Sequence, residues 1–313
     1  MRVVFLGTPT FAVPSLRILL EHSYEICGVF TQPDRPSGRG QKLQPSPIKV
    51  LAQDHGIPVY QPARIRDEEN RVIFEALQPD FLAVVAYGQI LPGWLLKSAK
   101  IAPVNVHASL LPRYRGAAPI AWAILNGDSI TGVTTMMMAE GLDAGPILLQ
   151  QEIPIPIHQT AAELAEEIAE IGANLLIKTF AELEKNAITS LIQDESKVCW
   201  APRITKEMAP ISWHKRALDI HNQIRGLNPW PVAHTDFRGE HLRIWRSLPG
   251  DKTADCSLEP GTFLGNTRDG ICVQCGEGTA LEILEVQMPG KGKVSGRAFA
   301  NGARLNPGDL ISH

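Results

Sequence analysis

Short apolar runs alternate with amphipathic segments along the first half of the chain. Buried strands are expected at 1–7, 26–30, near Val59, and at 80–88, 104–107, 131–138 and 150–155. Helices are expected between them at 13–22, 48–55, 72–77 and 119–126. Alternating strands and helices are typical of a parallel sheet covered by helices. The pattern therefore predicts an α/β fold for the N-terminal part, with a mostly parallel, Rossmann-like sheet.

The pattern changes after a long predicted helix. Thr160 and Glu163 form a capping box at its start, and apolar residues then recur at helical spacing. Beyond a linker, a helix at 213–224 and short alternating strands are expected at 242–245, 261–264, 271–273 and 281–286. Short strands separated by Gly and Pro are typical of a small β-barrel or sandwich. We therefore expect a domain at 1–189, a linker at 190–207 and a β-barrel domain at 208–313.

The composition argues against several classes of protein for this chain. The 313 residues are 44% hydrophobic and 20% charged, as in an ordinary globular protein. No run of 18 apolar residues appears, so no membrane span or membrane partner is expected. Five scattered cysteines favour a reducing, cytoplasmic compartment, or an equivalent organellar matrix. The Cys272–Cys275 pair lacks a second ligand pair, so we expect no metal site.

The first strand ends without a dinucleotide-binding motif. Gly7 is followed by Thr8 and Pro9, and the chain contains no G-x-G-x-x-G. A nicotinamide or flavin cofactor is therefore not expected.

The candidate chemistry is concentrated at the end of the strand at 104–107. Side chains alternate along a strand, so Asn105 and His107 share one face, opposite Val104 and Val106. The loop at 140–146 carries the carboxylate of Asp143 between two glycines. Considered alone, Asn-x-His also fits a polar edge strand, and Asp143 also fits a β-turn that bonds its own backbone.

Basic residues gather in the segment 31–49. It contains four prolines, and its basic residues are Arg35, Arg39, Lys42 and Lys49. We expect an irregular loop, either solvated and mobile or binding a phosphate backbone. The net charge is −3, but residues 203–313 carry +2 and the rest −5, which permits nucleic-acid contact in the C-terminal part.

Two motifs resemble the folate-dependent formyltransferase family. The first is Asn105-x-His107 with Ser109-Leu110-Leu111-Pro112-Arg113-Tyr114-Arg115-Gly116, and the second is Gly141-Leu142-Asp143-Ala144-Gly145. Three further features resemble the tRNA-formylating members: the basic loop, Asn228-Pro229-Trp230-Pro231, and the C-terminal β-rich domain, which in that family is an OB-like barrel that helps to bind tRNA. The similarity covers essentially the whole chain.

The resemblance implies both substrates and their sites. The formyl donor would be 10-formyltetrahydrofolate and the acceptor the α-amine of methionine on initiator tRNA, with no metal. The folate would contact the backbone of Ser109, Leu110, Leu111 and Pro112 and a pterin pocket lined by Ala86, Tyr87, Gly88, Gln89 and Ile90. The tRNA would contact Arg35, Arg39, Lys42 and Lys206. We expect a monomer.

The chemical properties of Asn105, His107 and Asp143 also fit formyl transfer, independently of the resemblance. Formyl transfer to an amine passes through a tetrahedral intermediate whose oxyanion needs hydrogen-bond donors and whose amine must lose a proton. Asn105 can donate, His107 can donate or accept, and Asp143 can orient His107 or accept a proton. Two alternatives remain: a formyltransferase acting on a sugar-nucleotide amine, and a non-catalytic RNA-binding protein.

Overall fold

The computed structural model describes residues 1–37, 42–250 and 257–311, and these residues form two compact units. The first unit comprises Met1–Gly116, Thr131–Ile153 and Ala165–Ala201, and the second comprises Ala117–Ile130, Pro154–Leu164 and Pro202–His313. Two short segments from within 1–189 thus belong to the second unit. Among the described residues, no helix has both the length and the apolar character needed to cross a membrane.

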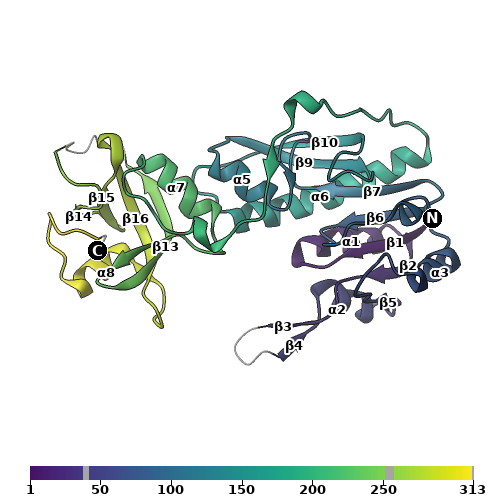
Figure 1. Cartoon of the computed structure of the whole chain (residues 1–313), viewed down its shortest axis with the longest axis horizontal. Coiled ribbons are helices and arrows are strands. Elements are labelled where there is room, and N and C mark those ends of the chain that lie inside the picture. Colours follow the sequence, from purple (N-terminus) through teal and green to yellow (C-terminus); the bar gives the residue numbers. More distant parts are fainter. Residues whose placement is uncertain (38–41, 251–256, 312–313) are drawn as a thin grey trace. The chain divides into compact units, whose positions relative to one another are not determined.

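A seven-stranded sheet forms the centre of the first unit (Figure 1). Its strands are β1 (Arg2–Gly7), β2 (Glu25–Phe30), β5 (Val59–Tyr60), β6 (Phe81–Val85), β7 (Ala102–His107), β9 (Ile130–Met137) and β10 (Ile147–Pro154). They lie in the order β10-β9-β7-β6-β1-β2-β5. The pairs from β7 to β5 are parallel and β9 is antiparallel to β7. The predicted α/β class with a mostly parallel sheet is confirmed.

Helices cover both faces of this sheet. They are η1 (Thr10–Ala12), α1 (Val13–Glu21), α2 (Pro47–Asp54), α3 (Glu68–Leu77), α4 (Gly93–Leu96) and α6 (Ala161–Glu184), whose first turn belongs to the second unit. Alternate residues of β6 face opposite sides: Phe81 stacks on Phe180 of α6, while Leu82 joins a buried cluster with Phe74 of α3. This alternation is the reason that the strand is apolar throughout.

The order of the strands reverses beside β1, because β2 follows on one side of it and β6 lies on the other. Open α/β sheets bind ligands beyond the carboxyl ends of the strands at such a reversal. The loop 86–90 leaves β6 at this position, and the side chains of Thr8 and Gln32 both donate hydrogen bonds to the carbonyl of Tyr87. A candidate ligand site is therefore placed at this edge by topology alone.

The segment 31–49 contains regular structure, contrary to the prediction. β3 (Arg35–Ser37) pairs antiparallel with β4 (Lys42–Gln44), and α2 begins at Pro47 with the Ser46 side chain as its N-cap. The four prolines of the segment do not prevent this pairing, because proline is tolerated in an edge strand, where no neighbour needs its missing N–H. In addition, Lys49 is held by Asp34 at 2.6 Å, so one of the four basic charges is neutralised locally.

An antiparallel sheet forms the core of the second unit. Its strands are β12 (His234–Phe237), β13 (Glu240–Pro249), β14 (Phe263–Asn266), β15 (Ile271–Gln274), β16 (Ala280–Gln287) and β17 (Val294–Ser295). Their order is β12-β13-β16-β15-β14, and β17 pairs with β16. The inner face of the curled sheet encloses a single apolar cluster that includes Leu242, Ile271 and Ile283. The predicted OB-like class is confirmed.

Helices α5 (Pro119–Leu125), α7 (Ala217–Gly226) and α8 (Gly296–Ala303) complete this unit, with the short elements η3 (Lys206–Met208) and η4 (Gly276–Gly278). The helix predicted at 213–224 begins four residues later. Gly226 lets α7 approach α5, because an added Cβ would lie 3.0 Å from the side chain of Leu125. Three small elements remain: β8 (Arg115–Gly116), β11 (Trp200–Ala201) and η2 (Glu195–Lys197), all in the first unit.

Candidate active site

The polar pair of β7 faces away from α6, as the alternation predicts. Val106 faces α6, since a Cβ added to Gly172 of that helix would lie 2.9 Å from Val106 Cγ1. Asn105 and His107 therefore occupy the opposite face, where they are paired in register with Met136 and Thr134 of β9. Asn105 is 9% exposed and His107 6% exposed. The polar-edge-strand interpretation is thereby excluded, because β7 is an interior strand.

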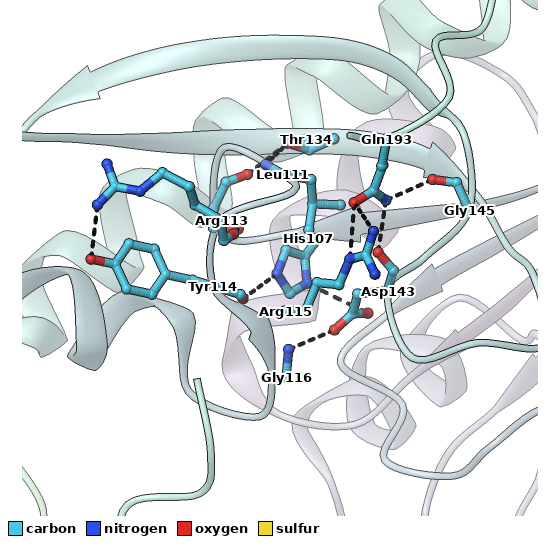
Figure 2. A network of polar contacts seen from close by, with 11 residues as sticks. His107, Leu111, Arg113, Tyr114, Arg115, Gly116, Thr134, Asp143, Gly145 and Gln193 are labelled. Atoms are coloured by element: carbon cyan, nitrogen blue, oxygen red, sulfur yellow. Dashed lines mark hydrogen bonds and ion pairs between the residues drawn. The ribbon is translucent and has the colours of Figure 1, made fainter. Parts of the chain in front are cut away.

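The two ring nitrogens of His107 face different groups, the carbonyl of Tyr114 and the carboxylate of Asp143 (Figure 2). Its Nε2 lies 3.0 Å from the carbonyl oxygen of Tyr114. A carbonyl only accepts, so Nε2 carries a proton. Nδ1 lies 3.7 Å from Oδ1 of Asp143, which is longer than a direct hydrogen bond. In the tautomer that carries its proton on Nε2, Nδ1 is an acceptor, and the nearby carboxylate would stabilise a positive charge on the ring.

Asp143 is fixed by a contact outside its own turn. Its Oδ2 accepts a hydrogen bond from the backbone N–H of Gly116 at 2.8 Å. Its backbone has a φ of +50°, in the left-handed region that L-residues rarely occupy. Gly145 follows where no side chain fits, because a Cβ there would lie 1.8 Å from the carbonyl oxygen of Met137. The loop thus holds one carboxylate at a specified place, at a cost in backbone strain.

The amide of Asn105 has unused hydrogen-bonding capacity. Across the part of the chain that the structure describes, no other protein group forms a hydrogen bond with this side chain. A nearly buried amide normally finds a partner. The free donor next to His107 therefore suits a bound group.

The segment that follows β7 is braced by side chains of β9 and β10. Thr134 donates to the carbonyl of Ser109 at 2.6 Å and accepts from the N–H of Leu111 at 3.1 Å. Gln150 donates to the carbonyl of Leu111 at 2.9 Å. The Ser109 hydroxyl is also used, since it donates to the carbonyl of Arg113. Several backbone groups that were expected to meet the folate are therefore already paired within the chain.

The loop 86–90 has a different character. Ala86 and Gly88 both have positive φ, at 48° and 88°. Gln89 is turned inward, where its carboxamide bonds to the N–H of Ile65 and the carbonyl of Pro62, while Ile90 is 85% exposed. The hydroxyl of Tyr87 is buried with no partner among the described residues, and burial raises the pKa of this phenol above its ordinary value. The loop consequently offers a protonated phenol and an apolar side chain.

The basic residues predicted to bind tRNA lie in different places. Arg35 is exposed on β3, and Lys42 lies on β4. Arg39 falls outside the described residues. Lys206 is exposed at the start of η3, in the second unit. Arg35 and Lys42 are thus brought onto one hairpin.

One residue of the site, Gln193, was missed by the sequence analysis, and another, Arg115, was included in the family motif without being given a role. Gln193 is 5% exposed and contacts Arg115, Asp143 and Gly145, and Arg115 is 3% exposed. Gln193 comes within reach because Leu191 forms a β-bridge with Ile147, which brings the segment after α6 alongside β10. It had been assigned to a linker, and no local pattern of apolar residues or motif marks it. A contact between residues 50 positions apart in the sequence leaves no periodic signal.

Two family models match the chain. The model for formyl transferase matches residues 1–180, and the model for the formyl transferase C-terminal domain matches residues 203–304. The fold and the two family models thus define the chain as a formyl transferase.

Relatives of nearly the same length show which kind of formyl transferase the chain resembles. The chain is 47% identical over 310 residues to a methionyl-tRNA formyltransferase from Trichlorobacter lovleyi, covering 99% of this chain and 96% of the relative. It is 48% identical over 292 residues to one from Clostridium novyi, covering 93% of each. The chain therefore belongs to the formyl transferase family, within its methionyl-tRNA formyltransferases.

A solved structure of lower identity shares the fold. It is an N-formyltransferase from Helicobacter canadensis in complex with folinic acid and dTDP-3-aminofucose, with a TM-score of 0.68 and 21% identity. The match covers 90% of this chain and 98% of that one. At this identity the likeness concerns the fold alone.

Proposed function

We propose that this enzyme transfers the formyl group of 10-formyltetrahydrofolate to the α-amine of methionine on initiator tRNA. The observation that carries the proposal is the cluster of Asn105, His107 and Asp143: a free amide donor beside an imidazole whose Nδ1 faces a carboxylate. The names of the nearly full-length relatives support tRNA as the carrier of the amine.

Each of the three side chains has a role in this proposal. The amide of Asn105 donates to the formyl oxygen as that oxygen gains negative charge. His107 accepts the proton of the attacking amine at Nδ1, since Nε2 already holds a proton shared with Tyr114. Asp143 stabilises the protonated ring and, through Gly116, keeps a fixed position. The amine itself is the nucleophile, so no enzyme nucleophile takes part. When the tetrahedral intermediate collapses, the bond between the formyl carbon and N10 of the folate breaks, and the proton held by His107 passes to N10, which releases tetrahydrofolate.

The folate is proposed to occupy the edge where the strand order reverses. Residues Ala86–Ile90 would line the pterin pocket, with the backbone of Ser109–Pro112 beside it. The phenol of Tyr87 suits a polar ring system, because it is a buried donor without a partner among the described residues. The carboxamide of Gln89 is engaged with Ile65 and Pro62, so its backbone would be the group available.

The tRNA is proposed to contact basic groups of both units. Arg35, Arg39 and Lys42 would form the contact in the 31–49 segment, and Lys206 would contribute beside the C-terminal domain. In this proposal the first unit carries out the transfer and residues 208–313 hold the tRNA. The segment 190–207, expected as a linker, joins them in the chain, and its part up to Ala201 belongs to the first unit. Such an enzyme would act as a monomer where initiator tRNA is charged, in the cytoplasm or an organellar matrix.

The decisive experiment supplies the purified chain with 10-formyltetrahydrofolate and one of three amines. Methionyl initiator tRNA should be formylated, whereas elongator methionyl-tRNA and an amino-sugar nucleotide should react at least 100-fold more slowly in kcat/KM. Preferred turnover of the sugar nucleotide would assign the chain to the alternative transferase activity. RNA binding without formylation of any amine would contradict transferase function.

A further inference from the structure

Gln193 uses every hydrogen-bonding position of its side chain (Figure 2). Its Oε1 accepts from Nε and Nη2 of Arg115 at 3.0 and 2.9 Å. Its Nε2 donates to the carbonyl oxygens of Asp143 and Gly145, both at 2.7 Å. A carboxamide offers two acceptor positions and two donors, so its orientation is fixed by its partners.

The two carbonyls belong to the strained part of the Asp143 loop. Asp143 has a φ of +50°, and Gly145 lies against the carbonyl oxygen of Met137. A conformation of this kind persists when neighbouring contacts over-determine it. The two N–H groups of Gln193 donate to the carbonyl oxygens that precede and follow Ala144. They therefore restrain the backbone from which the carboxylate of Asp143 projects.

The Oε1 atom of Gln193 binds Arg115, which belongs to the segment that contacts His107. Arg115 lies between Tyr114, whose carbonyl accepts from His107 Nε2, and Gly116, whose N–H donates to Asp143. The guanidinium of Arg115 is buried, and on its outer side it meets Glu195, whose side chain is 73% exposed. One side chain thus joins the backbone that orients the imidazole to the backbone that carries the carboxylate.

We propose that Gln193 is a positioning residue that sets the separation between His107 Nδ1 and Asp143 Oδ1 for formyl transfer. The inference rests on the proposed function, because it assigns Gln193 to the same site. Gln193 itself exchanges no proton with the substrates. Its effect reaches the reaction through Asp143, so it acts on turnover and leaves substrate binding nearly unchanged.

The most informative variant is Gln193→Glu, because the glutamate side chain has the same shape as that of glutamine. A glutamate still accepts from Arg115, but its second oxygen would face the carbonyl oxygens of Asp143 and Gly145 with no proton to donate. Gln193→Met removes all four hydrogen bonds while keeping the length of the side chain. The matched control is Gln151→Glu, the same substitution at an exposed side chain of β10.

Both Gln193 variants should lower kcat for formylation of methionyl-tRNA by 10- to 100-fold, with both KM values within about threefold of wild type. Gln151→Glu should match wild type. A rise in KM with kcat unchanged would overturn the proposal, as would wild-type kinetics. If both variants fail to fold in thermal unfolding, Gln193 supports stability instead, and the proposal is wrong.

A second measurement needs no substrate. The amide of Gly116 is bonded to Asp143 Oδ2, so its hydrogen exchange reports the position of the carboxylate. Exchange of this amide should be at least 10-fold faster in Gln193→Glu than in wild type, with the amides of β6 unchanged. Unchanged exchange would show that Gln193 does not hold Asp143. This result stands even if wild type fails to formylate methionyl-tRNA, which would contradict the proposed function alone.

Discussion

Asn105 and His107 are adjacent on one face of β7 but are held in different ways. His107 is tied to Tyr114 through Nε2, whereas the amide of Asn105 has no bond to another described residue. This difference suits the roles proposed for the two residues. As the proposed base, His107 must keep a fixed direction toward the amine, and as the proposed donor, Asn105 must remain available for the oxygen that gains charge.

Replacing Asn105 tests the donor. Asn105→Ala should lower kcat by about 10²–10³, because one hydrogen bond to the developing negative charge is lost. Single-turnover formylation of methionyl-tRNA measures this step. Asn174→Ala, at an exposed position of α6, should retain full activity. A fall of less than threefold in the Asn105 variant would remove the residue from the mechanism.

Replacing Asp143 tests the charge that faces His107. Asp143→Asn keeps an acceptor for the N–H of Gly116 but removes the negative charge 3.7 Å from Nδ1. We expect a loss in kcat of about 10²–10⁴, the range found for acid–base catalysis. Steady-state kinetics with both substrates measures it. Asp236→Asn removes a carboxylate from an exposed Asp–His pair and should leave kcat unchanged; equal losses in both variants would contradict the assignment.

At the scale of elements, the site depends on a loop with little freedom to rearrange. Asp143 has a left-handed backbone conformation, and Gly145 occupies a position that a residue with a side chain would have to leave. The strain is offset by hydrogen bonds from Gln193 and Gly116, which come from elements distant in sequence. The Asp143 loop, the segment that follows β7 and the segment after α6 are therefore held together by hydrogen bonds, so that a shift in one would displace the others.

Gly145→Ala should disrupt this group. Its Cβ would lie 1.8 Å from the carbonyl of Met137, so the backbone must shift and Asp143 with it. We expect at least a 100-fold loss in kcat/KM, together with a lower melting temperature. Gly302→Ala is the control, because a Cβ there meets no atom within 4 Å. Normal activity in Gly145→Ala would mean that the loop tolerates displacement.

The capping box at the start of α6 makes a separate contribution to stability. Glu163 accepts from the N–H of Thr160 and pairs with Arg246, and these contacts lower its pKa from 4.5 to about 2. Glu163→Ala should reduce the free energy of unfolding by about 1 kcal/mol at pH 7. Because the folded-state pKa is depressed, this contribution is complete above pH 4.5 and is lost as the pH falls toward 2. Urea titrations of wild type and variant at pH 7 and pH 3 measure it; an equal difference at both pH values would contradict the mechanism.

At the scale of the whole molecule, charge is distributed unevenly. The chain carries −3 overall, yet residues 203–313 carry +2. An acidic protein that binds a polyanion needs local basic groups, such as Arg35 on the β3–β4 hairpin and Lys206 on η3. Contacts with phosphate release counterions, so such binding weakens as salt rises.

Salt dependence provides the test at this scale. The affinity for initiator tRNA should fall by at least 10-fold between 50 and 200 mM salt, and the slope of log K against log salt should become shallower by about one for each phosphate contact removed. Arg35→Ala and Lys206→Ala should each weaken tRNA binding while leaving the KM for the folate unchanged. Filter binding and formylation kinetics measure the two effects. A slope unaffected by either variant would exclude both residues from the tRNA contact.

The sequence by itself determined the elements and most of their faces. Residues Phe81–Val85 could only be an interior strand, and Asn105 and His107 had to share a face, because strand geometry alternates side chains regardless of context. Even the capping box at Thr160 was predicted, since its partners are three residues apart. Local prediction was wrong at the β3–β4 hairpin, because an edge strand tolerates proline, and it placed the start of α7 four residues too early.

Only the tertiary structure decided what completes the site. That the carboxylate of Asp143 bonds to Gly116 and that Gln193 joins Arg115 to the Asp143 loop both depend on contacts between residues far apart in the chain. Periodicity reports which face of an element is apolar and carries no information on which distant side chain lies against a given polar group. These hydrogen bonds join residues that are 27 to 78 positions apart in the sequence, so they depend on how the strands pack and not on a local pattern.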